Sequence, residues 1–223
     1  HMSSKAGMEA ARRARENGVK AYVESCPQYL LLTDERYALP GFEGAKYAVS
    51  PPLRKAQDAG ALWEAVSSGE VDTIATDHCS FNFKGQKELG KADFSKIPNG
   101  APGVQTRPAL LYTYGVEAGK LSLEGFCRLL SENPAKLYGM YPEKGSLSVG
   151  SDADIVVWDP RAKDVITAKN QLSACDYTPF EGMETEGKAA YVFVNGRLAA
   201  QDGDVANRYL GEYVARRPGM FWR

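Results

Sequence analysis

The chain has 223 residues, 43% of them hydrophobic, and its 27 lysines and arginines against 28 acids give a net charge of −1. This length and composition suit a globular protein with a buried core. The basic residues are scattered and no apolar stretch is long enough to span a bilayer, so neither nucleic acid nor a membrane is expected as a partner.

Four widely spaced cysteines form no Cys-x-x-Cys pair, and the sequence shows no pattern of a secretion signal. Reduced thiols in a cytoplasmic protein are therefore expected.

The first half of the chain alternates helical and extended patterns. Lys5–Glu16 is rich in alanine and arginine, follows two serines and precedes Gly18, which is typical of a capped helix. Val19–Glu24 contains alternating β-branched and aromatic residues and predicts a strand. Asp58–Ser68 predicts a second helix and Val71–Thr76 a second strand. Successive helix–strand units favour an α/β fold with a parallel sheet.

The second predicted strand ends in a candidate site. Thr76, Asp77 and His78 lie where a buried parallel strand would leave the sheet at its carboxyl end, which is the end that carries the chemistry in α/β barrels. For an isolated Thr-Asp-His, a capping aspartate and a structural histidine are the favoured alternative. The flanking segments have to decide between the two.

Two stiff loops flank this strand. Ser50 precedes Pro51 and Pro52, which remove two backbone donors and favour extended geometry. Ile97–Gly103 contains two prolines, two glycines and Asn99, so it can follow a tight path beside a ligand. Each loop could present backbone groups to a ligand or could be a plain turn, and the residue pattern leaves both alternatives open.

The second half begins helical and becomes β-rich. Helical patterns cover residues 106–116, 122–130 and 133–139. Ala190–Ala199 then predicts a hairpin with an Asn-Gly turn.

Three parts are expected on this basis. Residues 1–142 would form βα units, residues 143–206 an all-β part, and residues 207–223 an aromatic and basic tail. The tail could pack on its own domain or on another subunit.

Seven segments occur in the order found in one enzyme family: Glu24–Leu30 (ESCPQYL), Val49–Arg54 (VSPPLR), Ala75–Ser80 (ATDHCS), Ile97–Gly103 (IPNGAPG), Asn133–Lys136 (NPAK), Gly150–Ile155 (GSDADI) and Asp176–Gly182 (DYTPFEG). On these segments the chain resembles the C-terminal half of the dihydropyrimidinase and D-hydantoinase family of cyclic amidohydrolases. NPAK and GSDADI are shared by many amidohydrolases, whereas Cys-Pro-Gln-Tyr and the Asn-Gly-x-Pro-Gly loop narrow the choice.

The resemblance implies a zinc-dependent hydrolase that opens a cyclic amide or imide ring, such as a dihydropyrimidine or a hydantoin. It also implies a TIM-like (β/α)8 amidohydrolase barrel with a small β-sandwich domain, a binuclear Zn2+ centre bridged by a carboxylated lysine, and a homo-oligomer, a homotetramer in the family. On this resemblance, residues 1–142 are the C-terminal βα units of the barrel and residues 143–206 are part of the sandwich.

The resemblance also assigns site residues. Asp77 would be a metal ligand and the catalytic aspartate, because a carboxylate beside a zinc-activated water can take its proton and pass it to the leaving nitrogen. Ser50 and Asn99 would bind the cyclic amide through main-chain groups. His78 is expected to have a structural role beside the site.

His1 has two interpretations. In the family a metal-binding histidine is followed by a short segment rich in serine or cysteine and then a lysine, as in His1-Met-Ser-Ser-Lys5, so the resemblance makes His1 a zinc ligand. A His-Met start is also what remains after expression cloning, and then His1 would have no role.

Most of the family's metal ligands are not found in this sequence. A His-x-His pair, the bridging lysine, a further histidine and a substrate-facing tyrosine would all lie upstream, and two ligands cannot hold a binuclear centre. The parent enzyme is therefore expected to be active and this chain alone inactive. Two alternatives remain: a non-catalytic scaffold relative, against which Asp77 argues, and a domain fragment whose only activity is oligomerisation.

Overall fold

The computed structural model describes residues 1–219. Its α-helices are α1 (Lys5–Glu16), α2 (Pro27–Leu31), α3 (Ala56–Ser67), α4 (Arg107–Leu111), α5 (Leu123–Cys127) and α6 (Asn133–Leu137). Its strands are β1 (Glu24–Ser25), β2 (Thr73–Ile74), β3 (Ile155–Val165), β4 (Glu184–Val194), β5 (Arg197–Gln201) and β6 (Asp204–Val205). Its 3-10 helices are η1 (Asp34–Ala38), η2 (Glu43–Tyr47), η3 (Lys87–Gly90), η4 (Phe94–Lys96) and η7 (Ala168–Asn170), and its π-helical turns are η5 (Tyr112–Glu117) and η6 (Arg128–Glu132).

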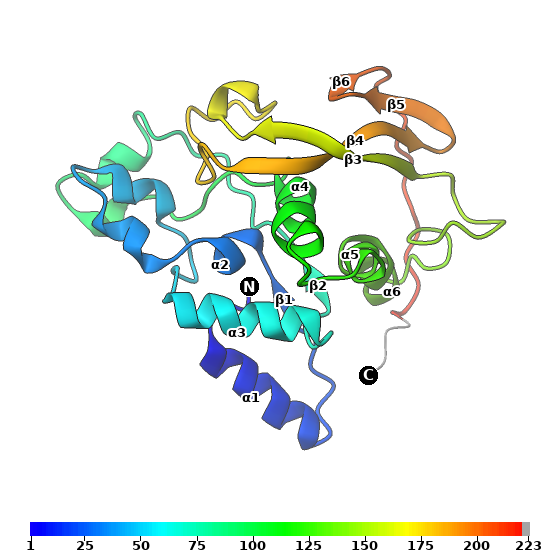
Figure 1. Ribbon diagram of the computed structural model, residues 1–223, viewed down its shortest axis with the longest axis horizontal. Helices are drawn as coiled ribbons and strands as arrows, with labels where there is room; N and C mark the ends of the chain where they lie inside the picture. The colour runs from blue at the N-terminus through cyan, green and yellow to red at the C-terminus, as the bar shows by residue number, and fades with distance from the viewer. Residues whose placement is uncertain (220–223) are drawn as a thin grey trace.

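The described residues form two sheets, one made of β1 and β2 and the other of β3 to β6. The helices α1 and α3 lie along one side of β1 and β2, and α4 lies between these strands and the sheet formed by β3 to β6 (Figure 1). In the part of the chain that the structure describes, no helix has both the length and the apolar character needed to cross a bilayer.

The strands β1 and β2 form the predicted parallel pair. Glu24 pairs with Thr73 and Ser25 with Ile74, and the crossover between them contains α2 and α3. The fold is therefore α/β, as predicted. The barrel, the sandwich and the division at residue 142 stay predictions.

Both strands are shorter than their sequence patterns suggested. The predicted strand at Val19–Glu24 is wrong in its bounds, because the ladder begins only at Glu24. The Val23 amide donates to the carboxylate of Asp72, at 2.6 Å, rather than to a backbone carbonyl. Asp72 is itself buried and paired with Arg15 of α1, so a side chain occupies the place of one ladder bond.

The helix at Lys5–Glu16 has the predicted bounds. The Ser4 side chain accepts a hydrogen bond from the Gly7 amide, which satisfies one of the free donors of the first turn. After the C-cap, Gly18 has a φ of +80°, a conformation that suits glycine at a helix end.

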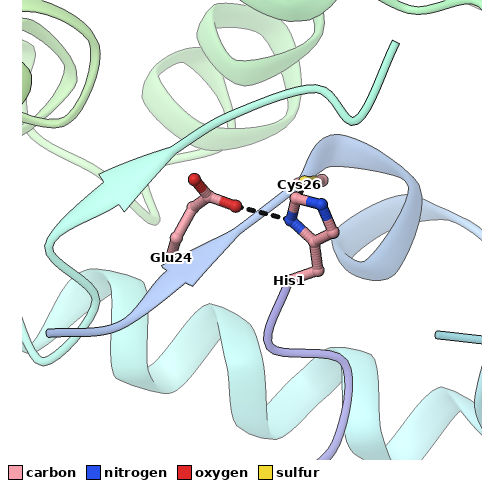
Figure 2. A group of neighbouring side chains, drawn as sticks. All are labelled: His1, Glu24 and Cys26. Atoms are coloured by element: carbon pink, nitrogen blue, oxygen red, sulfur yellow. Dashed lines mark hydrogen bonds and ion pairs between the residues drawn. The ribbon is translucent and has the colours of Figure 1, made fainter. Parts of the chain in front are cut away.

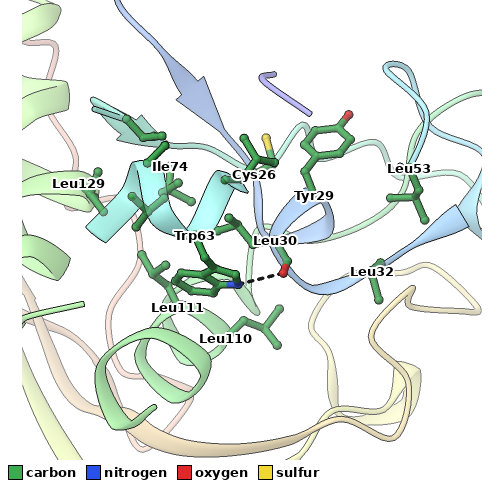
Figure 3. Packing of buried hydrophobic residues seen from close by; sticks show 14 of the residues in the cluster. Cys26, Tyr29, Leu30, Leu32, Leu53, Trp63, Ile74, Leu110, Leu111 and Leu129 are labelled. Carbon is green, nitrogen blue, oxygen red and sulfur yellow. Dashed lines mark hydrogen bonds between the residues drawn. The ribbon is translucent and has the colours of Figure 1, made fainter. Parts of the chain in front are cut away.

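The core lies where α2, α3 and α4 meet β2. Trp63 of α3 packs against Leu110 and Leu111 of α4, and its indole nitrogen donates to the carbonyl of Leu30 at 2.9 Å (Figure 3). Each such buried side chain contributes about 1.5–3 kcal/mol to stability. This packing fixes the end of β2, from which Asp77 follows.

The helices predicted in the second half lie where they were expected, but the predicted interruption between residues 130 and 133 is absent. The patterns at 122–130 and 133–139 form one continuous run, α5, η6 and α6. Pro134 lies just after the wider turn η6, and the missing amide and bulky ring of proline account for that change of pitch.

The strands β3 to β6 form an antiparallel sheet in chain order. The predicted hairpin turn is confirmed, with Asn195 at φ +49° and Gly196 at φ +72° between β4 and β5. The ring of Trp158 on β3 lies 5.3 Å from that of Tyr112 and 5.8 Å from that of Phe126. Through this aromatic cluster, the sheet packs against the helices.

The C-terminal segment runs back along the helices. The Arg217 amide donates to the Gly139 carbonyl, and Leu210 is buried. Tyr209 and Tyr213 are exposed. The other aromatic residues of the predicted tail, Phe221 and Trp222, lie outside the described residues.

Candidate metal and substrate site

Asp77 turns its carboxylate towards the beginning of the chain. Its φ is +50°, an uncommon conformation for a residue other than glycine and one that aspartate tolerates. Its Oδ1 atom lies 3.3 Å from Nε2 of His1. Partial burial raises the pKa of Asp77 above its ordinary value, and the nearby Glu24 carboxylate acts in the same direction.

His1 is held by β1. The Met2 amide donates to the Glu24 carbonyl at 2.7 Å, and the Ser25 hydroxyl donates to the Met2 carbonyl at 2.8 Å. The imidazole Nδ1 lies 2.6 Å from Oε1 of Glu24 (Figure 2). In the neutral tautomer that donates Nδ1–H to Glu24, the lone pair of Nε2 faces Asp77.

The His1 and Asp77 pair fits a divalent cation. With the ring neutral, a nitrogen lone pair and a carboxylate oxygen face each other at 3.3 Å, and a cation between them would be attracted to both. Two ligand atoms with bonds of about 2.0–2.2 Å to one tetrahedral zinc are separated by about this distance. The donor types, imidazole nitrogen and carboxylate oxygen, are also those that zinc prefers.

A second grouping of possible ligands overlaps this pair. His1, Glu24 and Cys26 have potential ligand atoms within 4.8 Å of one another, and the Cys26 sulfur lies 3.8 Å from Nδ1 of His1. Burial raises the pKa of the Cys26 thiol to about 12, which disfavours the thiolate that a metal needs. Because Glu24 already occupies Nδ1, this grouping orients the imidazole rather than binding a metal through it.

His78 forms hydrogen bonds on both sides of its ring, which support a structural role. Its Nδ1 accepts hydrogen bonds from the amides of Gly103 and Val104, at 3.0 and 3.2 Å. Its Nε2 therefore carries the proton and donates to the Ser80 hydroxyl at 2.9 Å. These bonds fasten the end of the glycine-rich loop to the segment that follows Asp77.

The two predicted substrate loops lie side by side with the strand end. The Gly100 amide donates to the Ala48 carbonyl at 2.9 Å, and the Cys79 amide donates to the Ala101 carbonyl at 3.0 Å. Ser50 and Asn99 are both exposed. The structure thus brings the segments of Ser50, Asp77 and Asn99 together, although they are distant in sequence.

The cavities beside these segments differ in size. Val49, Thr76 and Ala101 help to line a cavity of about 10 Å³, which has room for one water at most. A cavity of about 340 Å³ lies beside His78 and is lined in part by Ser173, and its lining leaves out Asp77.

Sequence reasoning missed two residues around this site. Glu24 lies in the ESCPQYL segment, but only the fold shows that it contacts His1. Lys87 lies in a charged, glycine-containing stretch that resembles a solvated loop, yet its side chain is completely buried. Neither residue carried a sequence signal of its own.

Comparison with known proteins assigns this chain to a family. The sequence profile of the amidohydrolase family matches residues 1–199. The chain is 43% identical to a D-hydantoinase of Geobacillus stearothermophilus over 217 residues, which is 97% of this chain and 46% of that protein.

Two solved structures agree with this match. A D-hydantoinase from Bacillus sp. AR9 has a TM-score of 0.95 at 43% identity, over 98% of this chain and 48% of that one. A dihydropyrimidinase from Brevibacillus agri NCHU1002 has a TM-score of 0.90 at 44% identity, over 92% of this chain and 45% of that one. The chain therefore spans about half the length of the relatives that it matches. It belongs to the amidohydrolase family.

Proposed function

We propose that the parent protein is a zinc-dependent hydrolase that opens cyclic amide or imide rings of the hydantoin or dihydropyrimidine type. The observation that carries the proposal is the separation of 3.3 Å between Asp77 Oδ1 and His1 Nε2, at the carboxyl end of a buried parallel strand. The similarity to proteins named D-hydantoinase and dihydropyrimidinase supports the choice of substrate class.

His1 and Asp77 would each give one ligand to a zinc centre whose other ligands come from the rest of the parent protein. When bound, zinc polarises the amide carbonyl and lowers the pKa of a bound water towards neutrality. Asp77 accepts a proton from the attacking water and transfers it to the leaving nitrogen of the ring.

Ser50 and Asn99 would orient the ring. A cyclic amide or imide presents alternating N–H donors and carbonyl acceptors along one edge, and main-chain groups of two adjacent loops can match such an edge. Hydrogen bonds from a fixed backbone hold the carbonyl at one distance from the metal without the entropy cost of ordering side chains.

The remaining features of the proposal concern the whole protein. It would be a cytoplasmic homo-oligomer, with a TIM-like barrel and a small β-sandwich domain to which β3–β6 belong. This chain alone would not turn over substrate, because it has two histidines in all and a binuclear centre needs more ligands than His1 and Asp77 supply.

Turnover of the parent protein tests the proposal. Hydantoin and dihydrouracil hydrolysis and zinc content are measured for the parent, for its Asp77→Asn variant and for this chain alone. We expect about two zinc ions and turnover in the parent only, with kcat reduced at least about 10³-fold in Asp77→Asn. Asp204→Asn, which changes an exposed acid on β6, is the matched control and should retain full activity.

Other outcomes exclude the proposal in different ways. A parent protein that folds and assembles but neither binds zinc nor hydrolyses either ring would be the scaffold alternative. Turnover by this chain alone would contradict its expected incompleteness, and full activity in Asp77→Asn would remove Asp77 from the catalytic machinery.

A further inference from the structure

Lys87, the first residue of η3, has an exposure of 0%. Lysine is almost never fully buried unless its charge is paired. Among the described residues no carboxylate forms an ion pair with it. Its ammonium group instead lies 5.9 Å from the ring centre of Phe81 and donates to two main-chain carbonyls.

Those two carbonyls belong to the loops that carry Ser50 and Asn99. Lys87 Nζ donates to the Ala48 carbonyl at 2.9 Å and to the Pro98 carbonyl at 2.6 Å. Ala48 lies two residues before Ser50, and Pro98 directly precedes Asn99. The Lys87 side chain therefore links the two loops through hydrogen bonds to both.

Among the described residues, one main-chain hydrogen bond also links the two loops, from the Gly100 amide to the Ala48 carbonyl. A third segment holds the second loop, because the Tyr177 hydroxyl donates to the Gly100 carbonyl at 3.3 Å, which is long for such a bond. Charge-assisted hydrogen bonds are roughly twice as strong as neutral ones, so the Lys87 ammonium makes the strongest of these links.

Burying this charge is costly for folding. An apolar side chain of the same length would fill the same space without the desolvation penalty. Burial lowers the pKa of Lys87 to about 8, which expresses that penalty. The ammonium gives what an apolar residue cannot, a fixed distance between two carbonyls that lie next to the exposed residues Ser50 and Asn99.

We propose that Lys87 is a positioning residue for substrate binding: by holding the Ala48 and Pro98 carbonyls together, it sets the spacing of the Ser50 and Asn99 main-chain groups that bind the ring. This inference rests on the proposed function. The hydrogen bonds of the buried Lys87 ammonium go to main-chain carbonyls of the two loops, so its removal should affect substrate binding and leave the metal centre intact.

The test uses the full parent protein loaded with zinc. In Lys87→Met, whose side chain is one atom shorter and has no donors, we expect KM for hydantoin to rise about tenfold or more, while kcat stays within about threefold and zinc content is unchanged. Lys87→Gln retains an amide donor for one carbonyl and should give a smaller rise in KM. Lys84→Met, at an exposed lysine of the same segment, should leave KM unchanged.

Three results would overturn the inference. An unchanged KM in a folded Lys87→Met variant would show a structural role alone, whatever the change in melting temperature. A fall in kcat that follows loss of zinc would place the effect at the metal centre. Failure of both Lys87 variants to fold would show that the residue is needed for folding and does not act as a separate positioning group. Wild-type turnover measured in parallel separates these results from failure of the proposed function, in which the wild type itself would be inactive.

Discussion

Glu24 Oε1 lies 2.6 Å from Nδ1 of His1, so the carboxylate at the beginning of β1 fixes which ring nitrogen faces Asp77. A carboxylate in this position selects the tautomer of a metal-binding histidine and raises its basicity.

This relationship predicts the effect of Glu24→Gln in the parent protein. Loss of the negative charge should weaken zinc binding by about tenfold or more, because the partners of ligating histidines typically contribute 10–100-fold to affinity. Competition with a chelator measures the change. Glu16→Gln, an exposed acid at the end of α1, is the control and should have no effect.

Cys26→Ser separates the two possible ligand groupings. Because the Cys26 thiol stays protonated beside His1, this substitution should leave zinc affinity within about twofold of the wild type. A loss as large as that in Glu24→Gln would instead make Cys26 a ligand.

The buried acid Asp72 should dominate local stability. Its carboxylate is paired with Arg15 and with the Val23 amide, at 2.8 and 2.6 Å. Asp72→Ala leaves the buried Val23 amide without its acceptor and removes the counter-charge of Arg15, whose guanidinium keeps only main-chain carbonyl partners. The substitution should lower the free energy of unfolding by about 3–5 kcal/mol. Glu70→Ala, which breaks the more exposed pair with Arg12, should cost about 1 kcal/mol or less. Urea denaturation compares the two, and equal losses would contradict this ranking.

The pH dependence of stability should report the burial of Lys87. Its pKa is about 8 in the folded protein against 10.5 for an ordinary lysine. Below about pH 8 the lysine is charged in both states and the full penalty of burial applies. As pH rises from about 8 to 10.5 the folded protein releases this proton before the unfolded chain does, so the penalty disappears. Relative to Lys87→Met, the wild type should therefore gain up to about 3 kcal/mol over this range.

The denaturation midpoint of both proteins, measured at several pH values, checks this expectation. A difference between them that stays constant with pH would mean that the Lys87 ammonium is not desolvated in solution.

Gly139 should be needed to hold the C-terminal segment. Its φ is +71°, and a Cβ at this position would collide with the carbonyl of Arg217. Gly139→Ala should therefore displace the segment and speed tryptic cleavage after Arg208 and Arg216 several-fold, with a stability loss of about 1–3 kcal/mol. Gly211→Ala, which meets no atom within 4 Å, should leave the cleavage rate unchanged.

Features that depend on residues close together in the sequence could be predicted from it. The Ser4 cap and the Asn195–Gly196 turn depend on nearby residues, and each was predicted where it is found. The strand before Asp77 was predicted in the right place, but its ladder is limited to Thr73–Ile74. The short extent of β1 was not predictable, because a buried carboxylate from a segment 49 residues away takes the Val23 amide.

The same reason explains what was missed at the site. The roles of Glu24 and Lys87 follow from contacts with His1, Ala48 and Pro98, which only the folded chain brings within reach. A residue-type pattern identifies strand ends and turns, whereas charged groups that orient other groups are set by long-range packing.

The most direct measurement is anomalous diffraction at the zinc edge from crystals of the parent protein. We expect a peak about 2.0–2.2 Å from both His1 Nε2 and Asp77 Oδ1, with Glu24 still bonded to Nδ1 of His1. A peak bound to Glu24 and Cys26 instead, or no peak near Asp77 in an enzyme that turns over hydantoin, would contradict the assignment of Asp77 as a metal ligand.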